Sequence, residues 1–374
     1  MLVKSNFDNT MVQKIIKALF VVVTITSIIL LFLSFPAWYV SPLRTAFFSF
    51  MGIAFPIILT SNILCLIFWV LLKKWKVVLI IGAALVLCYK PITTFFPLNL
   101  KTQTVPDEPL KMLTYHVMGF MGESKKNSAH PLLEYIAKTD ADIVCLQEYM
   151  ISKTGKSLLT QKDVDKILKK YPYRSITGLE YSGKYHTYGL ACFSKYPINS
   201  TREFTFKSSY NGAAVYTIDI NGEKYLVANN HLESNKISAS DKKLYSNLLV
   251  KRDSQTAYKV TTNIRERLGR GYSKRATQVQ QISDYIDKQE YDKLIICGDF
   301  NDTPISYAYK KMKGNLTDAY TSTGFGPGIT YYEDYFLFRI DYILHSKSLK
   351  SYKTTVDRVK FSDHYPVLTY LKEQ

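Results

Sequence analysis

The pattern of apolar positions divides the 374-residue chain into two parts. Residues 18–43 and 45–72 carry no charged side chain, and a third apolar run covers residues 77–89. Because about 20 mostly apolar residues suffice to cross a bilayer, the first two runs predict transmembrane helices. The third run is shorter, but it completes a span if Lys90 snorkels and the apolar residues after it join the helix. We therefore expect a membrane anchor of about three helices within residues 1–98.

After a polar linker at residues 99–110, short apolar runs alternate with patterns of helical period. The predicted strands are 111–117, 143–146, 190–193, 213–220, 224–228, 294–297, 340–344 and 366–371, and the predicted helices are 130–138, 161–170, 241–267 and 275–288. This alternation, with a hairpin signal at Asn221-Gly222, predicts one α/β domain with mixed sheets over residues 111–374.

The flanking charges predict the orientation of this anchor. The lysines on either side of the apolar runs are Lys4, Lys14, Lys17, Lys73, Lys74 and Lys76. The loop between the first two runs has only Arg44, and basic residues favour the cytoplasmic side. Three crossings therefore place the domain outside the cytoplasm, whereas a third run that lies in the interface leaves it inside.

The whole chain is basic, with a formal net charge of +17, and part of the excess is concentrated in one segment. Between Asn235 and Arg275, eleven Lys or Arg stand against three acidic residues. Such a segment suits a phosphate-rich surface, although a solvated helix produces the same pattern. Lys242, Lys243 and Arg275 are the candidates for substrate binding within it.

The segment IICGDFNDTP at residues 295–304 carries the clearest chemical signal. An apolar strand ends at Gly298, and Asp299 and Asn301 follow it. A carboxylate that accepts a proton from water, beside an amide that holds water or a phosphoryl oxygen, suits attack on a phosphorus ester. The structural alternative for the same letters is a turn stabilised by an Asx hydrogen bond.

Other polar residues of catalytic type also stand where predicted strands stop. They are His116 in TYHV, Glu148 in LQE, Asn230 and His231 in ANNHLES, Asp341 in RIDYIL, and Asp363 and His364 in FSDHYPV. Strand ends on one edge of a sheet converge in space, and open α/β sheets place their sites there. Each residue alone is more often an ordinary strand-end polar residue, but their repetition predicts one shared site.

The motifs LQE, GDFN and SDH, in that order, give residues 111–373 a specific likeness. The chain resembles the endonuclease/exonuclease/phosphatase superfamily, which includes deoxyribonucleases, abasic-site endonucleases, neutral sphingomyelinases and inositol polyphosphate phosphatases. The resemblance implies a four-layer sandwich of two mixed β-sheets flanked by helices. It also implies a metal-dependent phosphoester hydrolase that uses an activated water, with Mg²⁺ as cofactor and Mn²⁺ as the alternative.

The resemblance further implies roles for single residues. Glu148 corresponds to the metal-binding carboxylate, with Asp363 and His116 beside the metal. Asp299 and Asn301 correspond to the pair that activates and positions the attacking water. The residues implied to act on the phosphate are His231 and His364, with Asp341 holding His364, and Asn230 is a further substrate-binding candidate.

Two departures from the family pattern keep the function open. The first strand of the family usually ends in Asn where this chain has His116, and no Glu stands near residues 188–191 to pair with the central histidine. The favoured function is a membrane-anchored phosphodiesterase or phosphatase acting on lipid headgroups or small phosphoesters. The alternatives are an extracytoplasmic endo- or exonuclease and a catalytically degenerate binding protein. No obligate protein partner is inferred.

Overall fold

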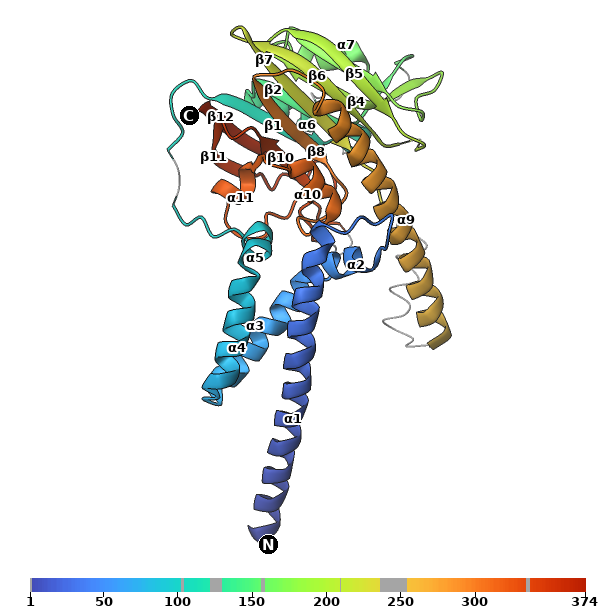
Figure 1. Ribbon diagram of the computed structural model, residues 1–374. Helices are drawn as coiled ribbons and strands as arrows, with labels where there is room; N and C mark the ends of the chain where they lie inside the picture. The colour runs from blue at the N-terminus through green and yellow to red at the C-terminus, as the bar shows by residue number, and fades with distance from the viewer. Residues whose placement is uncertain are drawn as a thin grey trace. The chain divides into compact units, whose positions relative to one another are not determined.

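The computed structural model describes residues 2–101, 104–121, 130–155, 159–208, 210–235, 254–333 and 337–374, without the side chains of 2–10 and 254–261. The chain divides into two compact units (Figure 1). One comprises residues 1–94 with 305–307, and the other comprises residues 95–304 with 308–374.

The first unit is helical. Its helices are α1 (Leu2–Ser34), α2 (Phe47–Ile53), α3 (Phe55–Leu71), α4 (Trp75–Leu87) and α5 (Tyr89–Phe95), with a 3₁₀ turn at Phe35–Trp38. Among the described residues, the stretch from Met11 to Trp38 is long and apolar enough to cross a membrane by itself. The pairs α2/α3 and α4/α5 qualify only if each bent pair, at 61° and 67°, forms one span. The region therefore holds one to three helices of membrane-spanning type.

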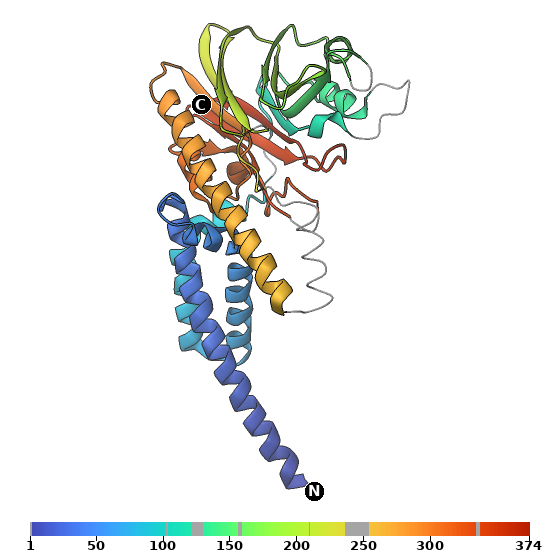
Figure 2. The same cartoon turned by 90° about the vertical axis from the view of Figure 1, so that its right-hand side faces the viewer.

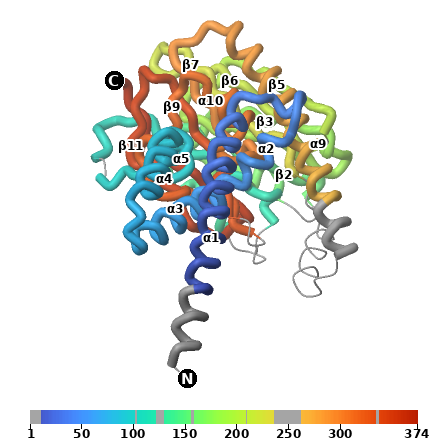
Figure 3. The backbone as a smooth tube through the Cα atoms, turned by 60° about the horizontal axis from the view of Figure 1, so that its bottom comes forward, coloured from blue at the N-terminus to red at the C-terminus, as the bar shows by residue number. Residues whose placement is uncertain are grey.

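Buried polar side chains help to join these helices. Helix α1 packs against α3, and α3 packs against α4 (Figure 3). The Asn62 amide on α3 donates to the Ser27 carbonyl on α1 at 3.0 Å, and the Trp69 indole donates to the Thr24 hydroxyl at 2.8 Å. In an apolar surrounding such bonds connect helices because the polar groups have no water as an alternative partner.

The second unit contains two six-stranded mixed sheets. The first has the order β11-β12-β1-β2-β4-β3, and the second has the order β5-β6-β7-β8-β10-β9. Only the central pairs β1/β2 and β7/β8 are parallel among the described strands. The strands are β1 (Leu110–His116), β2 (Ile143–Ser152), β3 (Tyr173–Gly178), β4 (His186–Ser194), β5 (Ile198–Thr205), β6 (Gly212–Ile220), β7 (Glu223–His231), β8 (Lys293–Asp299), β9 (Thr317–Asp318), β10 (Asp341–His345), β11 (Leu349–Val356) and β12 (Val367–Glu373).

The two sheets pack face to face and helices cover their outer faces. Alternate residues such as Cys145 of β2 and Cys297 of β8 meet in the core between the sheets, where they are fully buried. Helices α6 (Pro131–Thr139) and α7 (Gln161–Ile167) cover the first sheet, and a second apolar cluster fills that interface. Helix α9 (Ser254–Ile286) lies along the second sheet, where Tyr285 contacts Phe204 at 5.4 Å (Figure 2). This confirms the predicted α/β sandwich.

The predicted break between the helices at 241–267 and 275–288 is wrong. As far as it is described, α9 is one continuous helix that runs through the expected break at residues 268–274, and 241–253 lie outside the described residues. Gly271 marks a close approach in this helix, because a Cβ there would lie 3.1 Å from Asn235 Oδ1. The glycine at this position thus serves tertiary packing.

The start of the predicted linker is attached to the α/β unit. Leu98 forms a β-bridge with Phe325, and the Asn99 amide donates to the carbonyl of Gly324 at 2.8 Å. These contacts attach the backbone that directly follows α5 to the α/β unit.

Candidate active site

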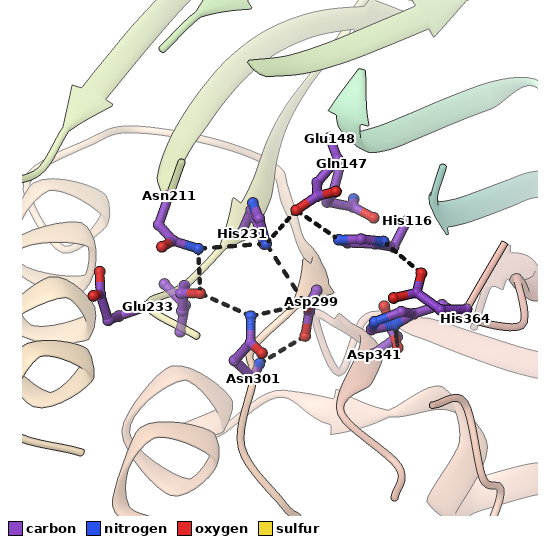
Figure 4. A network of polar contacts seen from close by, with 12 residues as sticks. His116, Gln147, Glu148, Asn211, His231, Glu233, Asp299, Asn301, Asp341 and His364 are labelled. Atoms are coloured by element: carbon purple, nitrogen blue, oxygen red, sulfur yellow. Dashed lines mark hydrogen bonds and ion pairs between the residues drawn. The ribbon is translucent and has the colours of Figure 1, made fainter. Parts of the chain in front are cut away.

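The ends of the central strands bring the predicted residues to one edge of the sandwich. His116 is the last residue of β1, His231 of β7 and Asp299 of β8. The antiparallel strand β10 begins there, with Asp341 paired opposite Asp299. Figure 4 shows their side chains directed toward one another, as the strand-end argument predicted.

Glu148 reaches the same place through a β-bulge. The pairing of β2 with β4 shifts between Leu146 and Tyr149, so Gln147 and Glu148 both stand opposite one residue of β4. Glu148 has φ 52°, a left-handed conformation that is costly for a residue with a side chain. Bulges of this kind re-aim side chains, and here the carboxylate turns into the site while the buried Gln147 amide donates to Asn229 Oδ1 at 2.6 Å.

The turn after β8 holds Asp299 and Asn301 as one unit. Gly298 has φ 113°, and a Cβ at this position would lie 2.1 Å from the Asn230 carbonyl oxygen, so only glycine fits beside β7. The Asn301 backbone N–H donates to Asp299 Oδ1 at 2.7 Å, and its side-chain amide donates to Asp299 Oδ2 at 2.8 Å. The Asx hydrogen bond considered as an alternative is therefore present, and it positions the carboxylate.

His364 is held between an acid and a second histidine. Its Nδ1 lies 2.8 Å from Asp341 Oδ2, and both residues are buried. Its ring stacks on His116 with centroids 4.2 Å apart and planes at 23°. Burial lowers the pKa of His364, but the Asp341 charge outweighs this and raises it above the ordinary value. The imidazolium form is thus favoured next to the site.

The two candidate reacting carboxylates have opposite pKa shifts. Burial, with a further contribution from the Asp341 charge, raises the pKa of Asp299 to about 7. Burial also opposes the charge of Glu148, but His116 and His231 outweigh it and lower the pKa of Glu148 to about 2. Carboxylates with separated pKa values suit different tasks, and Asp299 has the value of a base that works near neutral pH.

The histidines are shifted in opposite directions as well. Burial lowers the pKa of His116, but the charges of Glu148 and Asp363 raise it well above the ordinary value. Burial lowers the pKa of His231 to about 4, and the neighbouring His116 charge acts in the same direction. At neutral pH His231 is therefore an uncharged imidazole, which can donate one hydrogen bond and accept another.

The donor atoms present fit a divalent cation. Among the described residues, three groups of carboxylate and imidazole atoms lie within 4.8 Å of one another. They are His116, His231 and Asp299; His116, Asp363 and His364; and Asp299, Asp341 and His364. Carboxylate oxygens and imidazole nitrogens that have lost their proton are the usual protein ligands of divalent ions, so an ion would displace the proton of His116 or His364 on binding.

Two predicted substrate-binding residues turn out to be internal. Asn230 is fully buried and its amide donates to the carbonyls of Ala228 and Cys297, because neighbouring residues on a strand face opposite sides and His231 takes the site side. The Arg275 side chain is 0% exposed and bonds to Asp302 Oδ2 at 3.1 Å. Lys242 and Lys243 lie outside the described residues.

Two residues near the site escaped the sequence analysis. Asn211 donates to the Leu232 carbonyl at 2.9 Å and lies 3.4 Å from His231 Nε2. The hairpin signal at Asn221-Gly222 could have located it, because counting back from that turn pairs Gly212 with His231. Tyr188 on β4 is buried near Glu148, and burial together with that carboxylate raises its pKa. No sequence signal distinguishes Tyr188 from the many core tyrosines.

The fold of this chain is similar to that of several solved structures. Similar solved structures include an endonuclease/exonuclease/phosphatase from Beutenbergia cavernae (15% identity, 71% of each chain, TM-score 0.50) and one from Leptotrichia buccalis (18%, 70% of this chain and 99% of that one, TM-score 0.50). A beta toxin variant from Staphylococcus aureus with bound magnesium ions is also similar (20%, 71% and 100%, TM-score 0.46). No curated protein matches the chain.

Family models match both units. Residues 118–364 match the model described as the endonuclease/exonuclease/phosphatase family, and the chain belongs to this family. Residues 17–95 match a model described as a domain of unknown function (DUF8431). The first match covers the strands and turns that carry most of the site, so the α/β unit is a metal-dependent phosphoesterase fold.

Proposed function

We propose that the chain is a membrane-anchored, metal-dependent hydrolase of phosphoester bonds in lipid headgroups or small phosphoesters. The proposal rests above all on the buried Asp299, whose raised pKa and fixed hydrogen bonds to Asn301 prepare it to take a proton from water. In this proposal residues 1–98 are the anchor, 99–110 the linker and 111–374 the catalytic domain.

Each side chain of the site has a task in such a reaction. Asp299 accepts the proton of the attacking water, and Asn301 orients Asp299 through two hydrogen bonds. The His364 imidazolium, supported by Asp341, stabilises the negative charge that develops on the phosphoryl oxygens. The uncharged His231 offers a hydrogen bond to the phosphate from the other side. A divalent ion held near Glu148, Asp363 and His116 would polarise the phosphoryl oxygen.

The pH dependence of hydrolysis tests the role of Asp299. Because the base must be ionised, kcat/KM is expected to fall as the pH drops through about 7, the pKa of this carboxyl. Asp299→Asn removes the titrating carboxyl, so the rate that remains should lack this acid limb. The measurement is the kcat/KM profile of both proteins, and an acid limb that persists in the variant contradicts the assignment.

Membrane orientation is tested by reporter fusions to the full chain. If the third apolar run crosses, a reporter that works only outside the cytoplasm is active when fused after Gln374 and silent when fused at Lys74. Comparing the two fusions, each at a matched expression level, separates membrane orientation from differences in expression. The reverse pattern would place the catalytic domain inside the cell.

An extracytoplasmic nuclease is the second candidate, favoured by the exposed basic residues Arg265, Arg270 and Lys274 on α9. Cationic side chains along a helix can follow a phosphate backbone. Headgroup release from defined lipids and nicking of plasmid DNA, each with added Mg²⁺ or Mn²⁺ and after chelation, separate the two functions. Hydrolysis of neither substrate class would favour the degenerate binding protein.

A further inference from the structure

Imidazole nitrogens from two strands approach one carboxylate oxygen from a third strand. Glu148 Oε1 of β2 lies 3.5 Å from His116 Nε2 of β1 and 3.9 Å from His231 Nε2 of β7. Figure 4 shows both imidazoles directed toward this carboxylate oxygen. Asp299 Oδ2 lies next to them, 3.8 Å from His231 Nε2.

These separations are too long for direct hydrogen bonds, which span about 2.7–3.2 Å for N–H···O. They match the distances between ligands that share one ion. Two ligand atoms about 2.1 Å from the same ion are about 3.0 Å apart at a right angle and about 4.2 Å apart when opposite. Both the 3.5 Å and the 3.9 Å pairs fall inside this range.

The ring of His116 is held in the orientation that a ligand needs. Its second nitrogen, Nδ1, faces Asp363 Oδ1 at 3.5 Å, and its ring face stacks on His364. The Ser362 hydroxyl bonds to both the His116 carbonyl oxygen, at 2.7 Å, and Asp363 Oδ1, at 3.0 Å. A metal-ligating histidine usually has such a carboxylate at its other nitrogen, which fixes the ring.

We infer that this chain binds a first-row transition-metal ion through His116, His231 and Glu148, with His231 ligating the ion in place of the phosphate contact given to it above, and that the site prefers such an ion to Mg²⁺. The inference rests on the proposed function only in placing a metal at this edge of the sheets. Two imidazoles and one carboxylate form a donor set typical of catalytic zinc and related transition-metal sites, in which further coordination positions stay open. Mg²⁺ prefers oxygen ligands in near-octahedral geometry, and a site with two nitrogen donors favours the softer ions.

The test measures metal binding directly. The full-length protein in detergent is stripped with chelator and titrated with Co²⁺, a probe with visible absorption bands that respond to nitrogen ligation, and separately with Mg²⁺. His116→Asn, which exchanges the imidazole for an amide, is expected to weaken Co²⁺ binding by about 10–100-fold and to change the Co²⁺ spectrum. Mg²⁺ affinity is expected to change far less, so the ratio of the two affinities falls.

His186→Asn is the matched control, because this imidazole lies outside the donor group and contacts the Tyr181 carbonyl at 2.9 Å. It should leave both affinities and the spectrum unchanged. His231→Asn provides a second variant if His116→Asn does not fold, as judged by circular dichroism, and it should weaken Co²⁺ in the same way.

Two results would overturn the inference. Equal weakening of Co²⁺ and Mg²⁺ in the variants would show that the histidines do not select the metal. Tighter binding of both ions by His116→Asn would show that His116 acts as a cation between Glu148 and Asp363 and competes with the metal. A selective loss of Co²⁺ binding in a protein that hydrolyses no phosphoester would uphold this inference and refute the proposed function.

Discussion

Asp299→Asn is expected to lower phosphoester hydrolysis at least about a hundredfold, because the amide cannot take a proton from water. The carboxylate is 1% exposed, receives two hydrogen bonds from Asn301 and points into the site. Bulk water therefore cannot take over its role as proton acceptor. Glu148→Gln is expected to cause a loss of similar size by removing the charge that a cation requires. The measurement is the steady-state rate on the substrate found active.

The fold should survive these changes, because Asn and Gln keep the shape of the original side chains. Thermal unfolding of each variant checks this. Asp284→Asn, which alters an exposed carboxylate on α9, is the matched control and should keep the wild-type rate. Retention of more than half the wild-type rate by either site variant would refute the assigned roles.

Arg339→Met is expected to lower the free energy of unfolding of the α/β unit by about 3–5 kcal/mol, because it leaves a buried carboxylate without its cation. Arg339 is 3% exposed, and its guanidinium lies 3.0 Å from Asp318 Oδ2. The same carboxylate accepts hydrogen bonds from the Tyr309 hydroxyl and, through Oδ1, from two backbone N–H groups of α11 (Ala319–Thr323). Burial raises the pKa of Asp318, but Arg339 outweighs it and lowers the pKa, so the charge persists.

An exposed ion pair supplies the control for this prediction. Lys170 lies 3.0 Å from Asp140 Oδ1 with side chains 61% and 50% exposed, so Lys170→Met should cost less than about 1 kcal/mol. Urea denaturation followed by pulse proteolysis of the full-length protein reports both values. Equal costs for the two variants would mean that burial does not govern the strength of the Arg339 pair.

The strands that the sequence analysis missed are the edge strands. β3, β5, β9 and β11 are the outermost strands of the two sheets, and all four lacked a prediction. Residues 198–205 of β5 read INSTREFT, and none of them is buried. An edge strand pairs with only one neighbour and exposes many of its side chains to solvent, so its sequence needs no continuous apolar run. The central strands were predicted because burial on both faces demands apolar residues.

Among the site residues, those in one short motif were predictable, and those whose side-chain direction depends on packing were not. Asp299 and Asn301 were predictable as a pair, because a short motif after an apolar strand places them together. Asn230 and Arg275 were assigned to substrate, yet both side chains are internal. Side-chain direction depends on register and on which helix face packs, and a single sequence does not contain that information.

By itself, the sequence determined the α/β class, the order of the central strands along the chain and the residues at their ends, since local apolar periodicity and short motifs encode these features. Only the tertiary structure decided which atoms meet. The bulge that turns Glu148 inward depends on pairing with β4, which joins residues about forty positions apart. His116 approaches that carboxylate because β1 and β2 are neighbours in one sheet. The approach of His231 depends on the packing of one sheet on the other, because β7 belongs to the second sheet.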